Sequence, residues 1–138
     1  MTGYEMFWPM VAHVLLVFLL YGLLAMRRAA IVKAGKADRS VFRENRDEPS
    51  ESLVVRNSIA NQFELPVLFY AVSIVLYVAQ ADNLLAMVLA WIFVASRYAH
   101  AYVHVTINRL SLRGPLFLLG FLTLAAMWAW LAVWFVLS

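Results

Sequence analysis

The chain of 138 residues is dominated by four long apolar stretches, and three of them contain no charged side chain. The uncharged stretches cover residues 6–26, 65–81 and 115–138, and the fourth, over residues 83–108, contains one arginine. A helix crosses the hydrocarbon core of a bilayer with about 20 apolar residues. Inside a bilayer every backbone polar group needs an internal partner, which an α-helix provides. The sequence therefore predicts an all-α integral membrane protein, a four-helix bundle.

The composition excludes a soluble alternative. Hydrophobic residues make up 64% of the chain and charged residues 14%, whereas soluble domains average about 45–50% and about 25%. A small soluble domain buries only about 60–70% of the surface of its unfolded chain, so soluble enzyme folds are excluded. The net charge of +3 is too modest to indicate a nucleic-acid partner. Because the chain has no cysteine, any thiol chemistry needs a thiol from a substrate.

We expect one transmembrane domain spanning residues 1–138, with helices at residues 5–30, 52–81, 83–109 and 114–137 and a loop at residues 31–51. All eleven basic residues belong to the side of the membrane that the first and third connections share. The positive-inside rule then places the loop in the cytoplasm and both termini on the non-cytoplasmic side. The expected location is a bacterial inner membrane, with the lipid bilayer as the constant partner.

Polar side chains form a stripe on the second expected helix. Asn57, Asn61 and Glu64 are spaced i, i+4, i+7, which places them on one helix face. Arg56 and Gln62 flank this stripe. Ionisable groups inside a membrane are costly, about 2.5–3.5 kcal/mol each at mid-helix, and usually mark a functional site.

A matching stripe lies on the third expected helix, in the cytoplasmic half like the first. Its members are spaced i, i+3, i+7, i+11, and two further arginines follow at the start of the fourth helix: Arg97, His100, His104 and Asn108, then Arg109 and Arg113. Arginines bind carboxylates in a bidentate manner, and clustered cations lower the pKa of a thiol. The two stripes together predict a pocket for a small carboxylate-bearing anion, beside a bilayer that supplies a lipophilic co-substrate.

Structural interpretations compete with this one. Glu64 and Arg97 could form a buried ion pair between helices, and the two asparagines could be interhelical hydrogen-bonding groups. His100 and His104, at i and i+4, could hold a metal ion with Glu64 as the third ligand. His13, alone on an apolar helix, is more typical of an interhelical donor. The loop bases could simply bind lipid headgroups.

The motifs resemble those of the MAPEG family, the membrane-associated proteins in eicosanoid and glutathione metabolism, which includes microsomal glutathione transferases and prostaglandin E synthase. The resemblance extends over about residues 53–121. It depends on Asn61-Gln62-Phe63-Glu64 followed by Pro66, and on Ser96-Arg97-Tyr98-Ala99-His100 followed by His104, Arg109 and Arg113.

The resemblance implies glutathione as co-substrate, held between neighbouring subunits of a homotrimer. Asn61 and Glu64 would hold its backbone and amino end, and Arg113 would be the catalytic residue beside the sulfur. The other residues expected to line the glutathione pocket are Arg56, Asn57, Arg97, His100, His104 and Arg109. No metal is expected.

The implied activity is a glutathione-dependent transferase or peroxidase that acts on lipophilic electrophiles or lipid hydroperoxides through an activated thiolate. The alternative is a non-catalytic binding or scaffold protein that holds a lipid or anionic ligand in the same pocket. A transporter with Glu64 as coupling carboxylate is less favoured, because the polar stripes end at mid-bilayer.

Overall fold

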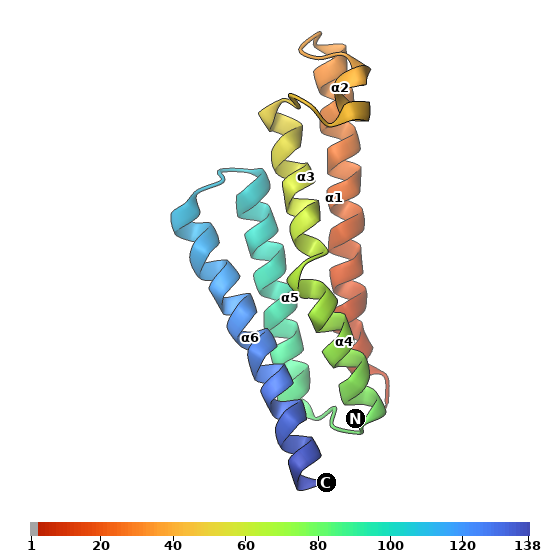
Figure 1. Cartoon of the computed structure of the whole chain (residues 1–138), viewed down its shortest axis with the longest axis vertical. Coiled ribbons are helices and arrows are strands. Elements are labelled where there is room, and N and C mark those ends of the chain that lie inside the picture. Colours follow the sequence, from red (N-terminus) through yellow and green to blue (C-terminus); the bar gives the residue numbers. More distant parts are fainter. Residues whose placement is uncertain (1–2) are drawn as a thin grey trace.

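The computed structural model describes residues 3–138, and this part of the chain consists of helices without strands. The helices form one elongated bundle, with the short α2 at one end and both chain ends at the other (Figure 1). In chain order the elements are the 3-10 turn η1 (Glu5–Phe7), α1 (Trp8–Lys33), α2 (Arg39–Glu44), α3 (Ser50–Gln62), α4 (Leu65–Val78), α5 (Leu84–Val105) and α6 (Leu110–Leu137).

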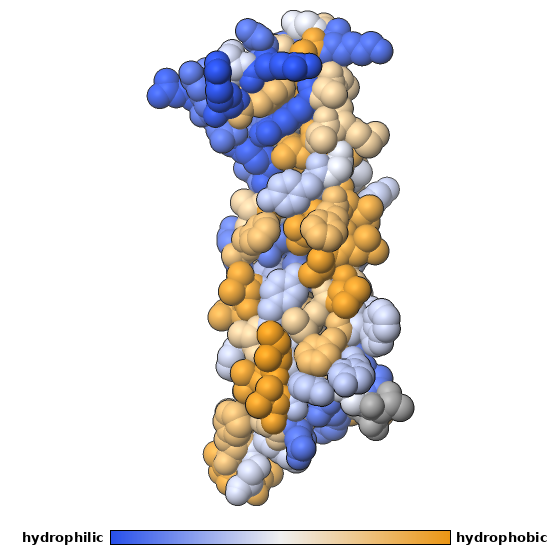
Figure 2. Space-filling model, turned by 90° about the vertical axis from the view of Figure 1, so that its right-hand side faces the viewer, coloured by the Kyte–Doolittle hydropathy of each residue, from blue (hydrophilic) through white to orange (hydrophobic). Residues whose placement is uncertain are grey.

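Four segments are long and apolar enough to cross a membrane: Glu5–Lys33, Ser50–Val78, Leu84–Val105 and Leu110–Leu137. The predicted all-α architecture with four apolar spans is therefore confirmed. Hydrophilic residues gather at the α2 end, and hydrophobic residues dominate the surface along the rest of the bundle (Figure 2). This distribution suits a protein whose outer surface contacts lipid, since large apolar side chains face outward from every span.

The second span is not the single helix expected over residues 52–81, because it is interrupted between Gln62 and Leu65. Helix α3 closes in a tight turn, in which the Phe63 N–H donates to the Ala60 carbonyl at 3.1 Å. The next turn cannot continue, because Pro66 has no N–H to donate to the carbonyl four residues earlier. The α3–α4 break is thus a consequence of the proline near the start of α4.

Apolar packing divides into two clusters. Around α4, α5 and α6, the Phe69 and Phe93 rings stack with their centroids 4.6 Å apart. Around α1, α3 and α5, leucines of α1 pack against Val55 and neighbouring side chains. Helices α5 and α6 approach closely at Gly120, where a Cβ atom would lie 2.8 Å from the Ser96 hydroxyl oxygen. Small residues at such contacts let membrane helices pack tightly.

The expected loop is an ordered cap on the polar end. Asp38 begins α2 by accepting a hydrogen bond from the Arg39 N–H at 2.7 Å, and Asn45 ends it in the left-handed conformation. Its charge content predicted a solvated, partly helical segment, and α2 is its helical part. The contacts that hold the cap to α1 and α3 depend on tertiary structure and were not predicted.

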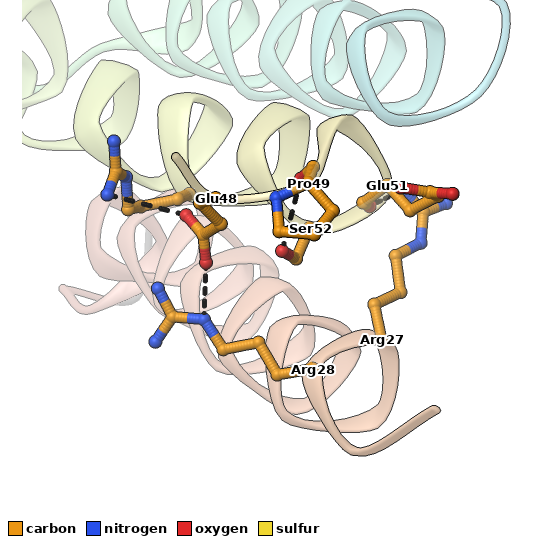
Figure 3. A network of polar contacts seen from close by, with 7 residues as sticks. Arg27, Arg28, Glu48, Pro49, Glu51 and Ser52 are labelled. Atoms are coloured by element: carbon orange, nitrogen blue, oxygen red, sulfur yellow. Dashed lines mark hydrogen bonds and ion pairs between the residues drawn. The ribbon is translucent and has the colours of Figure 1, made fainter. Parts of the chain in front are cut away.

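The polar contacts that hold the cap to the bundle centre on Glu48 (Figure 3), and its side chain is fully buried. One carboxylate oxygen accepts a hydrogen bond from Arg28 Nε of α1 at 2.6 Å, and the other lies 3.4 Å from a guanidinium nitrogen of Arg56 of α3. The Arg28 guanidinium also lies over the Phe42 ring of α2, 5.0 Å from its centroid. Charge and aromatic contacts therefore join α1, α2 and α3.

A second set of contacts joins the ends of the spans. Arg27 of α1 donates one hydrogen bond to the Glu51 carbonyl at 2.9 Å and another to the Val105 carbonyl at 2.8 Å. Lys36 pairs with the Glu51 carboxylate at 3.2 Å. Because Val105 is the last residue of α5, Arg27 satisfies a helix-end carbonyl that has no partner within its own helix.

Candidate functional site

Two adjoining cavities lie where the polar stripes of α3 and α5 meet the start of α6. The larger has a volume of about 480 Å³ and the smaller about 320 Å³. Both are lined by Asn61, Glu64 and Arg113. The two cavities therefore share residues next to the α3–α4 break, Asn61 and Glu64, and Arg113 of α6.

The lining brings together six of the nine residues predicted for the site. The larger cavity is lined by Leu53, Val54, Asn57, Ala60, Asn61, Glu64, His104, Asn108 and Arg113. The smaller is lined by Asn61, Glu64, His100, Leu110, Arg113, Gly114 and Phe117.

Three buried polar atoms of this lining have no hydrogen-bond partner among residues 3–138: Nδ1 of His100, Nδ1 of His104 and Nε of Arg113. Both histidines are buried, with 3% and 4% of their surface exposed, and their ring centroids are 5.9 Å apart. Buried polar groups in native proteins almost always have partners. Three such groups on one pair of cavities therefore indicate a binding site for a polar ligand.

Arg113 is fixed by its neighbour rather than by an acid. A terminal nitrogen of its guanidinium donates to the Asn108 side-chain carbonyl at 2.6 Å, and no acid pairs with it among residues 3–138. Glu64 is exposed at the rim of both cavities. The cavities thus offer one cation and one carboxylate with several amides and imidazoles, a donor set suited to a zwitterionic or carboxylate ligand.

Two predicted site residues lie elsewhere. Arg56 faces the polar cap and pairs with Glu48, although the stripe pattern placed it beside the asparagines. Arg109 is exposed at the start of α6 and lines neither cavity. Helical spacing gives the face of a residue, but it does not show which acid from a distant segment will pair with it.

Arg97 lies in the bundle interior, behind the cavities, with 2% of its surface exposed. Its Nε donates to the Gln62 side-chain oxygen at 3.3 Å, and a terminal nitrogen donates to the Asn61 carbonyl at 3.4 Å. Glu64 and Arg97 do not form an ion pair within the described residues. Arg97 therefore supports the backbone that carries Asn61.

Gln62 is the centre of this buried network. Its amide nitrogen donates to the Ser58 carbonyl at 3.1 Å, so its oxygen is the acceptor for His13 Nε2–H at 2.9 Å as well as for Arg97. The other ring nitrogen, Nδ1, of a neutral His13 then accepts from the Tyr70 hydroxyl. The expectation that His13 is an interhelical donor is confirmed, and α1, α3, α4 and α5 meet in this network.

The metal-site interpretation finds no cluster to support it. Residues 3–138 contain no group of three or more histidine, cysteine, aspartate and glutamate side chains placed to hold an ion. His100 and His104 instead lie with Arg113 around the cavities.

Sequence reasoning missed one wall of the site. Leu110, Gly114 and Phe117 of α6 line the smaller cavity together with Arg113. Their spacing of i, i+3, i+4, i+7 from Leu110 puts all four on one helix face. This periodicity was available in the sequence, but the apolar members resemble ordinary packing residues.

Comparison with known proteins gives one match. The family model described as MAPEG family matches residues 6–133. No curated protein and no solved structure matches the chain.

Proposed function

The chain belongs to the MAPEG family, and from this we propose that it is a glutathione-dependent transferase or peroxidase of a membrane. Its substrates would be lipophilic electrophiles or lipid hydroperoxides, which reach the site from the bilayer. The family as a whole acts in glutathione-related transfer and isomerisation within membranes. The assignment of transferase or peroxidase activity on lipophilic substrates to this chain is our proposal.

The observation that carries the proposal is the set of unpartnered buried atoms of His100, His104 and Arg113 at the paired cavities. Glutathione has two carboxylates, one ammonium group and two peptide bonds, and so matches a lining of mixed charge. Glu64 would bind the ammonium group of glutathione, and Asn61 and Asn57 would hydrogen-bond to its peptide groups. Arg113 and the imidazoles of His100 and His104 would bind its carboxylates and thiolate. Arg97 contributes by holding the Asn61 backbone in place.

The proposed chemistry is thiolate attack. A cation beside the sulfur favours the thiolate and stabilises charge that develops in the transition state. In transfer, the thiol proton goes to solvent, sulfur bonds to the electrophilic carbon, and the leaving group departs with the electron pair. With a hydroperoxide, sulfur bonds to the terminal oxygen and becomes a sulfenic acid, the O–O bond breaks, and the departing alkoxide takes a proton from solvent to give an alcohol. A second glutathione then converts the sulfenic acid to a disulfide and water.

The proposal includes an orientation and an assembly. The basic end with α2 would face the cytoplasm and both termini the opposite side, as expected from the positive-inside rule. A homotrimer would place a neighbouring subunit against part of the apolar surface that the single chain exposes. An inner membrane of a bacterium is the proposed location.

A non-catalytic binding protein is the alternative that one observation favours. Arg56, expected among the glutathione ligands, is engaged by Glu48 at the polar cap. Arg97 and Arg109 do not line the cavities either, so Arg113 is the one of the four expected arginines that does. This weakens thiolate stabilisation more than it weakens binding.

The test is calorimetric titration of the detergent-solubilised full chain with glutathione, together with turnover of chlorodinitrobenzene. Arg113→Gln should retain glutathione binding within a few-fold and lose most turnover. Arg109→Gln removes the same charge from the same helix outside both cavities and should leave both quantities unchanged. Absence of glutathione binding in the wild type refutes the proposal. Binding without turnover in the wild type supports the binding-protein alternative.

A further inference from the structure

A third cavity lies at the polar end of the bundle, away from the site described above. Its volume is about 560 Å³, and it is formed between the end of α1 and helix α2. Its lining is half basic and half apolar: Arg28, Lys33 and Arg39 with Ala29, Val32 and Phe42.

The positive charge of this cavity is not neutralised by the chain. Lys33 and Arg39 have no acidic partner among residues 3–138. Arg28 is bridged to Glu48, but Glu48 also serves Arg56, so this trio retains one net positive charge. Asp38, the nearest acid along the chain, accepts a hydrogen bond from the backbone N–H of Arg39. With Asp38 and Glu48 set against Arg28, Lys33, Arg39 and Arg56, two positive charges remain in excess. An anion is therefore the complementary ligand.

The cavity continues into an apolar stripe on α1. From Ala29 the helix presents, at steps of three or four residues, a single outward face that runs toward the middle of the span. Its members are Met26, Gly22, Phe18, Leu15 and Val11, and the four with large side chains are 52–70% exposed. No atom lies within 4 Å of the position that a Cβ of Gly22 would take, so the stripe has an open notch one helical turn below Met26.

We propose that this cavity and stripe form a binding site for an anionic phospholipid. The phosphate would lie among Lys33, Arg39 and Arg28 with the glycerol against Phe42, and an acyl chain would extend along α1 past Gly22. A cationic cavity at the end of a membrane span, open to an exposed apolar stripe, matches a molecule with a charged head and an apolar tail. A free phosphate would leave the apolar half without a role.

The experiment is native mass spectrometry of the full chain, released from detergent after titration with phosphatidylglycerol or with phosphatidylcholine of the same acyl chains. The wild type should prefer phosphatidylglycerol. The double variant Lys33→Gln/Arg39→Gln should bind it about 30-fold more weakly, at about fivefold for each base near a membrane surface. Arg43→Gln/Arg46→Gln removes the same charge from exposed positions of the same segment outside the cavity and should keep the preference.

Helical content and melting temperature without added lipid show whether each variant is folded. The proposal is overturned if the Lys33/Arg39 variant keeps the preference while folded, or if the Arg43/Arg46 variant loses it equally. It is also overturned if glycerol phosphate, the head alone, displaces phosphatidylglycerol at equal concentration, because the apolar stripe then contributes nothing.

Discussion

Replacing Gln62 by leucine is the sharpest probe of the buried network at the α3–α4 break. The substitution removes one acceptor that serves two donors, His13 Nε2–H at 2.9 Å and Arg97 Nε–H at 3.3 Å. Gln62 is 1% exposed and His13 0%, so water does not replace the lost acceptor. The variant therefore leaves two buried donors without a partner, one of them charged.

The expected cost is the sum of two contributions. Interhelical hydrogen bonds in membrane proteins contribute about 0.6 kcal/mol on average and at most about 1.7, which covers the contact with His13. A hydrogen bond to a charged group is worth about 1.5–3 kcal/mol, which covers Arg97, although its contact is long. We expect Gln62→Leu to lower the free energy of unfolding by about 2–5 kcal/mol on these values.

The assay is equilibrium unfolding in mixed micelles, followed by helical circular dichroism, with a double-mutant cycle. Gln62→Leu should cost about 0.6–1.7 kcal/mol less in a His13→Leu background than in the wild type, because one orphaned donor is then absent. Asn57→Leu replaces an exposed amide on the same helix and should change stability by no more than about 0.5 kcal/mol. A cost for Gln62→Leu below about 1 kcal/mol, equal in both backgrounds, would refute the reasoning.

Three further predictions concern the cap and the helix contacts. Glu48→Ala leaves Arg28 and Arg56, with 24% and 33% of their side-chain surface exposed, without their acidic partner. It should lower the free energy of unfolding by about 1–3 kcal/mol, with faster tryptic cleavage within residues 34–47 as the second readout. Gly120→Leu should destabilise the α5–α6 contact by about 1–3 kcal/mol in the same unfolding assay. The smaller loss of stability in Gly120→Ala should be restored by adding Ser96→Ala, because this removes the hydroxyl oxygen that lies 2.8 Å from the new Cβ atom. Trp134→Phe removes an indole N–H bond to the Ala79 carbonyl at 3.0 Å and should cost about 1 kcal/mol, with a changed near-ultraviolet circular dichroism spectrum.

The sequence was sufficient for properties that depend on local composition and helical period. Four apolar spans follow from the hydrocarbon thickness and the absence of charge, and the structure contains four such helices. The stripe residues Asn61 and Glu64 on one span and His104 on the next come together in one cavity. Spacing was informative here because each stripe is continuous on its own helix face.

The sequence was insufficient where a residue's partner lies on another element, whose position depends on how the chain folds. Arg56 is eight positions from Glu48, but their contact depends on how the cap folds back over α1 and α3. Arg97 and Arg109 were both predicted to line the glutathione pocket. In the structure Arg97 is buried in the bundle interior, whereas Arg109 is exposed. The break at Phe63 was likewise not assigned, because the polar stripe of Asn57, Asn61 and Glu64 keeps helical spacing across it and only Pro66 marks it.

The place of His13 in the network has a consequence for how the sequence can change over evolutionary time. His13 lies on α1 and lines neither cavity of the candidate site, yet the acceptor that it shares with Arg97 is on the last residue of α3 before the break. A substitution at position 13 alone removes the hydrogen-bond partner that His13 provides to the Gln62 side-chain oxygen and to the Tyr70 hydroxyl. We therefore expect positions 13, 62 and 97 to covary among relatives, even though 13 and 97 are 84 positions apart.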